Sequence, residues 1–152
     1  MRQYADIVAF DKNGQLTLIA EVKNKWGTSN DWATKMRRNM FSHGLMPHAP
    51  FFLLALPDVF YLWNGAISTP DLIEPNLKVD PRPFLQSHYA TSDNTIENLT
   101  GRSFELVVTS WLNQVLNTSN PQYLTDNHQE WLISSGLFGK IVGGHLELEA
   151  AA

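Results

Sequence analysis

The sequence contains no cysteine, which excludes disulfide bridges and metal sites built on thiolates. It contains no run of eighteen apolar residues, and its start, Met1-Arg2-Gln3-Tyr4, lacks the apolar segment of a secretory signal. We therefore expect a cytoplasmic protein. Basic residues are also scarce: eleven lysines and arginines against fifteen acidic residues give a net charge of −4. This balance argues against indiscriminate binding of nucleic acid through the whole surface.

What is present has the composition of an ordinary globular protein. Of the 152 residues, 43% are hydrophobic and 17% are charged, which suits a single domain with a substantial core. We expect residues 1–65 to form that core, 66–99 to make a proline-rich excursion over the surface, and 100–152 to add C-terminal helices and an edge strand. A helix between strands, followed by a strand buried on both faces, predicts an α/β fold with a mixed sheet.

The few basic residues are unevenly distributed. Five of the eleven fall within sixteen positions, with only Asp31 against them: Lys23, Lys25, Lys35, Arg37 and Arg38. From Ser103 onward Lys140 is the one basic residue, among five acidic ones. The positive charge is either the solvated face of a helix or a surface that attracts a phosphate backbone, and for the second reading Lys25, Arg37 and Arg38 are the candidates.

The most informative feature is a hairpin that carries carboxylates at its open end. Asp6 precedes an apolar run over 7–10, and a second run over 16–20 leads into Glu21-Val22-Lys23. If Asn13-Gly14 forms a two-residue type I′ loop, Lys12 pairs with Gln15 and Asp6 lies directly opposite Glu21. A three-residue loop with a bulge at Gly14 would shift the register and set Asp6 opposite Ala20 instead.

Two opposed carboxylates have a definite chemical use. At about 5 Å they repel by roughly 3 kcal/mol at an effective dielectric constant of about 20, which a shared proton or a divalent cation relieves. Side chains alternate along a strand, so Lys23 lies on the same face as Glu21. A hard cation held by Asp6 and Glu21, with Lys23 beside its bound water, is a device for hydrolysing phosphodiesters. The other reading is that Glu-Val-Lys is merely a solvated strand end.

The remaining elements follow from local patterns. Thr28 to Asp31 predicts a helix start, with Trp32, Ala33, Met36 and Met40 facing the core, Arg37 at the margin and Gly44 as the stop. Strands are predicted over 51–56 and 59–63. Later helices are predicted around 84–89, from Thr100 or Gly101 onward, and from Thr125 to Gly136. The second of these has an apolar face made of Phe104, Val107, Val108, Trp111 and Val115. Residues 141–148 predict an edge strand.

The segment Arg2 to Lys25 resembles the active-site hairpin of the PD-(D/E)xK nuclease superfamily, which has the restriction-endonuclease-like fold. The resemblance rests on Asp6, fourteen intervening residues and Glu21-Val22-Lys23, and the following helix and strands continue in the order of such a core. It implies that Asp6, Glu21 and the Val22 carbonyl bind Mg²⁺ (or Mn²⁺ in its place). It further implies that Lys23 is the third catalytic residue, and that Arg37, Arg38 or Asn39 is an additional polar group from the helix.

The resemblance also shows one departure. Such cores usually have a helix and a strand before the catalytic Asp, whereas five residues precede Asp6 here. We therefore expect an open sheet edge, to be filled by preceding chain or by another subunit in a homodimer or larger assembly, or else a loss of part of the nuclease machinery.

Three functions follow as hypotheses. The first is a Mg²⁺-dependent endonuclease that hydrolyses DNA phosphodiester bonds through Asp6, Glu21 and Lys23. The second is a catalytically inactive regulatory or assembly subunit of the same fold, binding DNA or a protein. The third is an unrelated α/β binding domain in which the hairpin charges are structural.

Overall fold

The computed structural model describes residues 5–42, 46–65, 69–89 and 95–148. The strands are β1 (Ile7–Phe10), β2 (Leu16–Val22), β3 (Phe51–Ala55), β4 (Phe60–Asn64), β5 (Leu77–Val79) and β6 (His145–Leu148). The helices are α1 (Asn30–Ser42), α2 (Arg82–Tyr89), the 3₁₀ turn η1 (Ile96–Asn98), α3 (Gly101–Leu116), α4 (Pro121–Asp126), α5 (Glu130–Ser134) and α6 (Leu137–Ile141). None of the helices in these ranges is long and apolar enough to cross a bilayer.

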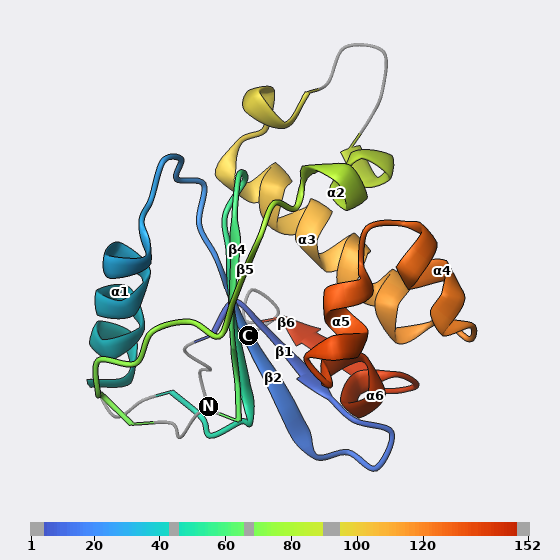
Figure 1. The fold of residues 1–152 in the computed structure, drawn as a ribbon, viewed down its shortest axis with the longest axis horizontal. Coiled ribbons are helices and arrows are strands. Elements are labelled where there is room, and N and C mark those ends of the chain that lie inside the picture. The colour runs from blue at the N-terminus through green and yellow to red at the C-terminus, as the bar shows by residue number, and fades with distance from the viewer. Residues whose placement is uncertain (1–4, 43–45, 66–68, 90–94, 149–152) are drawn as a thin grey trace.

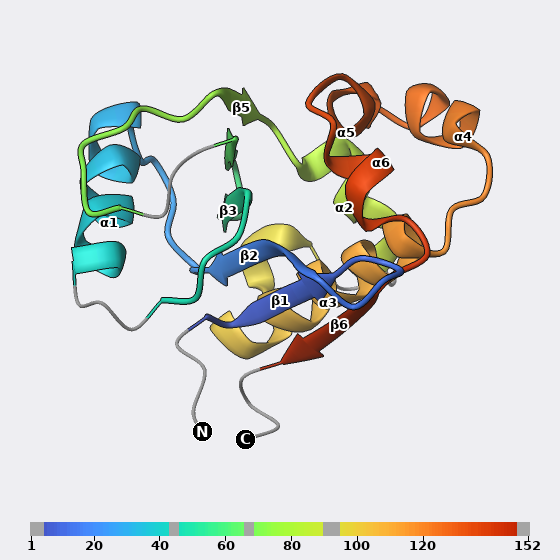
Figure 2. The ribbon, with the colours of Figure 1, turned by 90° about the horizontal axis from the view of Figure 1, so that it is seen from below.

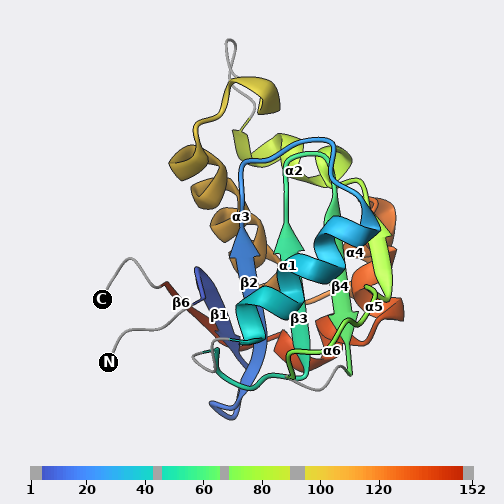
Figure 3. The ribbon, with the colours of Figure 1, turned by 90° about the vertical axis from the view of Figure 1, so that its left-hand side faces the viewer.

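The six described strands form one mixed sheet in the order β5-β4-β3-β2-β1-β6. Among them β2 and β3 are the parallel neighbours, and the chain passes between them through α1, as a parallel pair requires. Figure 3 shows the two strands running in the same direction, with the loop after β2 crossing over to α1. The predicted order of strand, strand, helix, strand, strand and the mixed α/β class are confirmed.

Apolar side chains fill both faces of the sheet and make two separate cores. Because side chains alternate along a strand, Ile19 and Phe52 face one way and Ala20 and Leu53 the other. The core that contains Ile19 and Phe52 is covered by α1. The core that contains Ala20 and Leu53 is covered by α3 with α2, α5 and α6 (Figure 1). The sheet is therefore the middle layer of three. All five residues of β3 are buried, as its unbroken apolar run predicts.

The hairpin has the predicted register but reaches it by a different route. Gly14 N–H donates to Asp11 O, Gly14 has φ +82°, and Asp11 N–H donates to Gln15 O, so the loop has three residues and is not type I′. Lys12 therefore does not pair with Gln15. The register shift that this loop causes is reversed by an extra residue, Thr17, between the pairs Phe10–Leu16 and Ala9–Leu18. Beyond it the pairing Ile7–Ala20 places Asp6 in line with Glu21.

The proline-rich stretch contributes more than a surface excursion. Strand β5 pairs with β4 at one edge of the sheet, and Phe84 and Leu85 of α2 are buried in the core beneath α3. The predicted short helix over 84–89 is confirmed, with its start two residues earlier. The prolines at positions 81 and 83 led to the prediction of a surface excursion, although proline suits the first turn of a helix as well as a loop.

The C-terminal elements agree with the patterns in part. Helix α3 begins after Thr100, whose hydroxyl accepts a hydrogen bond from Ser103 N–H, and its five predicted apolar positions are all buried. The predicted helix from Thr125 to Gly136 is wrong in its bounds. Helix α4 ends at Asp126 and α5 starts at Glu130, because His128 has φ +65°, which is incompatible with a continuous helix. The predicted helix stop Gly44 lies outside the described residues.

The expected open sheet edge beside β1 is filled by the same chain. Strand β6 pairs antiparallel with β1 in the register Ile7–Leu148 to Phe10–His145, and the two lie side by side in Figure 2. The ring of His145 stacks on that of Phe10, with 5.0 Å between centroids. The expectation of assembly through an open β1 edge is therefore corrected, since the β1 backbone groups are already paired within the chain.

Candidate active site

Two hydrogen bonds fasten the start of β1 to the end of β2. Asp6 N–H donates to Glu21 Oε1 at 2.8 Å, and Val22 N–H donates to Asp6 Oδ2 at 2.9 Å. Each carboxylate thus binds the main chain of the other strand, and together they continue the hairpin one pair beyond the regular ladder. The structure brings Asp6, Glu21 and Val22 together, as the register predicts.

The third predicted catalytic residue joins the same group. Lys23 Nζ lies 3.8 Å from Glu21 Oε2, and the Lys23 main-chain N–H donates to Ala55 O at 3.0 Å, which extends the parallel pairing of β2 with β3. The Glu21 side chain is 11% exposed and that of Lys23 is 37% exposed. A nearly buried carboxylate is therefore bordered by an ammonium that reaches solvent.

The site lies on the face of the sheet that α1 covers. Glu21 and Ile19 are two residues apart on β2, so their side chains point to the same face, and Ile19 packs in the core beneath α1. Across the sheet Glu21 is in register with Leu54, and Leu54 with Tyr61. The buried Tyr61 hydroxyl shares a 2.9 Å hydrogen bond with Thr28 Oγ1, in the loop that leads to α1. The carboxylates thus occupy the end of a surface that is otherwise apolar.

The predicted basic residues divide into exposed and buried ones. Lys25 is exposed, with Nζ 5.9 Å from the centre of the Trp32 ring, and Arg38 is half-buried, with its guanidinium donating to Asn39 Oδ1. Lys35 forms an ion pair with Asp31 on the solvent side of α1. Lys25 and Arg38 therefore keep their place as candidates for binding a phosphate backbone.

Arg37 does not lie at the margin of α1, and its role in substrate binding is corrected. It is 1% exposed, its Nη1 donates to the carbonyls of Thr69 and Asp71, and its guanidinium lies 4.7 Å from the centre of the Phe41 ring. Burial lowers the pKa of this guanidinium, and the Asp71 carboxylate opposes that shift. Arg37 thus ties the chain after β4 to α1.

Asp58 is a residue of this region that the sequence patterns did not single out. It follows Pro57 in the turn between β3 and β4, and its Oδ2 accepts a hydrogen bond from Gly27 N–H at 3.0 Å. Pro-Asp is an ordinary turn signal, so nothing in the sequence distinguished a carboxylate that holds a loop from one that only forms a turn. Its effect is to fix the loop after Lys23.

The donor set can be tested against a divalent cation. Asp6 and Glu21 each use one oxygen to bind a main-chain N–H, which fixes the orientation of the group and directs the second oxygens, Asp6 Oδ1 and Glu21 Oε2, elsewhere. In the part of the chain that the structure describes, no three histidine, aspartate or glutamate side chains gather as a metal cluster. Mg²⁺ commonly binds through one or two carboxylates and keeps several waters, so two carboxylates suit it better than they suit Zn²⁺.

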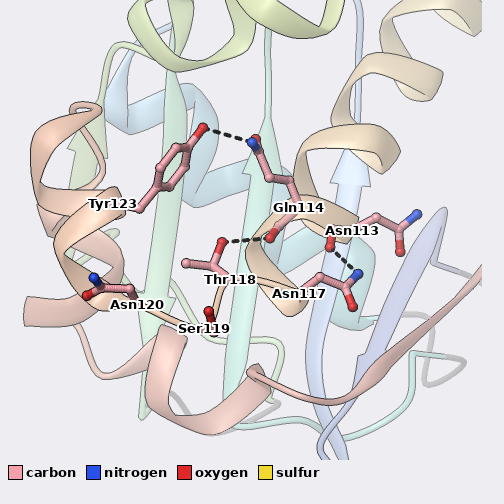
Figure 4. Close-up of a pocket in the computed structure, with 7 residues that line it drawn as sticks. All are labelled: Asn113, Gln114, Asn117, Thr118, Ser119, Asn120 and Tyr123. Atoms are coloured by element: carbon pink, nitrogen blue, oxygen red, sulfur yellow. Dashed lines mark hydrogen bonds between the residues drawn. The ribbon is translucent and has the colours of Figure 1, made fainter.

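A separate hollow of about 480 Å³ lies at the end of α3 (Figure 4). It is lined by polar side chains from α3 and α4 and from the turn between them: Asn113, Gln114, Asn117, Thr118, Ser119, Asn120 and Tyr123. Several of these bind one another, such as Gln114 Nε2, which donates to the Tyr123 hydroxyl at 2.8 Å. This described lining contains neither a carboxylate nor a basic group, so it offers no charged ligand for a cation and no acid–base pair.

No family model, curated protein or solved structure matches this chain. The functional argument therefore rests on the geometry of the hairpin and its surroundings.

Proposed function

We propose that this chain is a Mg²⁺-dependent endonuclease that hydrolyses DNA phosphodiester bonds. The observation that carries the proposal is the convergence of Asp6, Glu21 and Lys23 at the ends of adjacent strands, with main-chain bonds that hold both carboxylates. The mixed sheet, with β3 parallel to β2 after a crossover helix, agrees with the restriction-endonuclease-like core that the resemblance implies. Strand β6 of the same chain pairs with β1 at the edge that was expected to be open.

Each residue has a role in this proposal. Asp6, Glu21 and the Val22 carbonyl would hold Mg²⁺ or Mn²⁺, which when bound acidifies a water and neutralises charge on the phosphate. The Lys23 ammonium is held near Glu21 Oε2, where it can donate hydrogen bonds to the attacking water and to a phosphate oxygen as charge develops. The Val22 N–H bond keeps the Asp6 carboxylate from rotating away.

A catalytically inactive subunit of the same fold is the second candidate, and one observation favours it. The two carboxylates already serve as fasteners between the strands, so they have a structural use without any metal. In that case the protein binds DNA or a protein partner and does not cleave. The two candidates differ in whether the hairpin binds a divalent cation and whether Lys23 matters for activity.

Substitution of Lys23 tests hydrolysis directly. Lys23→Ala removes the ammonium but keeps the main-chain bond to Ala55, so the fold should persist while cleavage of DNA in Mg²⁺ falls by at least about 100-fold. Lys35→Ala, which removes an exposed lysine paired with Asp31 on α1, is the matched control and should cleave normally. Cleavage by Lys23→Ala at the wild-type rate would eliminate the proposed mechanism.

A further inference from the structure

Close to the candidate site along the chain lies a tryptophan that is partly exposed to solvent. Trp26 lies in the loop between β2 and α1, three residues after Lys23, and is 38% exposed. The other tryptophans are buried or half-buried, since Trp63, Trp111 and Trp131 belong to the two cores and Trp32 packs at the edge of one. A tryptophan has a large apolar surface whose exposure to water is unfavourable, so its position outside the core calls for an explanation.

The loop around Trp26 is fastened on both sides. Before it, Asn24 Nδ2 donates to Leu99 O at 3.1 Å, and after it Gly27 N–H donates to Asp58 Oδ2 at 3.0 Å. Gly27 has φ +70°, a conformation that other residues adopt only with strain, and Thr28 is bonded to the Tyr61 hydroxyl. The exposure of Trp26 is thus the consequence of a built loop that is anchored to three other parts of the fold.

Basic residues precede Trp26 in the chain and follow the start of the neighbouring helix, while the Asp58 carboxylate binds the next residue, Gly27. Lys23 and Lys25 precede Trp26 in the same loop, and both reach solvent. The start of α3 abuts the loop, since a Cβ placed on Gly101 would lie 3.9 Å from Asn24 Cβ, and the next residue, Arg102, is exposed. The amino end of a helix is itself partly positive, which adds to the attraction that these basic residues exert on a phosphate. An exposed aromatic ring beside lysines is the pattern by which proteins bind single-stranded nucleic acid.

We propose that Trp26 stacks on an unpaired base of a single-stranded nucleic acid while Lys23 and Lys25 bind the adjacent phosphates. The inference rests on the proposed function, because it names the substrate class of that same site. A duplex hides the faces of its bases in the stack, so it gains little from an exposed ring. The substrate would then be a single strand, or a duplex with an unpaired segment, with that segment passing the Asp6 and Glu21 carboxylates.

Binding of labelled oligonucleotides in EDTA tests the inference apart from hydrolysis. Fluorescence anisotropy would compare a single strand with its duplex at low salt. Trp26→Ala should weaken binding of the single strand about tenfold, as expected for the loss of one stacked base, and should change duplex binding by less than about twofold. Trp26→Phe keeps a stacking ring and should retain most of the affinity, which separates stacking from damage to the loop.

Tyr123→Ala is the matched control. Tyr123 is an aromatic residue that is 40% exposed on α4, next to the polar hollow, and its loss should leave binding unchanged. Wild-type affinity in Trp26→Ala, an equal loss on duplex, or the absence of single-strand binding by the intact protein would each overturn the inference. The binding assay contains no metal, so it is independent of cleavage. If binding depends on Trp26 but cleavage does not depend on Lys23, the nuclease proposal fails and the proposed nucleic-acid binding site remains.

Discussion

The carboxylates of Asp6 and Glu21 have both a structural and a chemical capacity. One oxygen of each is bound to a main-chain N–H of the other strand, and such charge-assisted bonds are among the stronger ones in proteins. The predicted arrangement is observed, but only because the bulge at Thr17 offsets the three-residue loop, and counting from the turn does not reveal such a bulge. The bonds themselves were not predictable, since they depend on which way two side chains turn at the end of the ladder.

Arg37 shows where reasoning from single residues fails. Helical spacing placed it at the margin of α1, and its charge suggested a surface role. Its partners are the carbonyls of Thr69 and Asp71, more than thirty residues later in the chain, and no local pattern announces them. The assignment of a basic residue to a substrate surface thus needs the tertiary structure.

Replacement of Arg37 should affect stability and not binding. Arg37→Met keeps much of the side-chain volume but removes the donors to two carbonyls, so the free energy of unfolding should fall by about 2 kcal/mol in urea titrations. Arg38→Met removes a charge from the same helix, where the guanidinium binds its neighbour Asn39, and should change stability by less than about 0.5 kcal/mol. A loss in Arg37→Met as small as the one expected for Arg38→Met would contradict a stabilising role for the buried bonds.

At the scale of elements, the central strands and long helices follow from the sequence, and so does an edge strand within 141–148, whereas β5 and the partner of β6 do not. The apolar runs of β3 and β4 and the apolar face of α3 are strong local signals, and the structure confirms them. Strand β5 has three residues and α6 has five, which is too short for periodicity to identify them. That β6 pairs with β1 depends on contacts between the two ends of the chain, which a local pattern does not encode.

Gly144 makes this edge pairing possible. It precedes β6, and a Cβ at this position would lie 1.8 Å from Phe10 O, a distance that requires the strand to move. Gly144→Ala should therefore displace β6, lower the free energy of unfolding by about 3 kcal/mol and speed hydrogen exchange in β1.

Gly139→Ala provides the control for this substitution. Gly139 lies in α6, and a Cβ added there would meet nothing within 4 Å, so alanine should leave stability unchanged or raise it by about 1 kcal/mol through helix propensity. If both alanine variants kept wild-type stability and exchange, β6 would not be packed as described. Self-association of Gly144→Ala in light scattering would further indicate that β6 protects the β1 edge.

At the scale of the whole molecule, the sheet joins the start of β1 to the end of β2, and contacts from distant segments fix the loop that follows β2. The start of β1 supplies Asp6, the end of β2 supplies Glu21 and Lys23, and the loop to α1, fastened by Asp58 and Leu99, presents Trp26. The first two were predictable from the sequence, since they belong to one hairpin. The third was not, because the anchors of the loop come from the β3–β4 turn and from the residue before Thr100.

The central claim is that Asp6 and Glu21 form one metal site, and calorimetric titration with Mn²⁺ tests it most directly. Asp6→Asn and Glu21→Gln each keep an oxygen that can accept the main-chain N–H bond while removing the charge, so they should fold. Asp11→Asn is the matched control, because Asp11 also accepts main-chain N–H bonds, at the opposite end of the same hairpin. We expect binding by the intact protein and by Asp11→Asn, and its loss in both other variants. Binding that persists in Asp6→Asn and Glu21→Gln, or no binding by the intact protein, would contradict the claim.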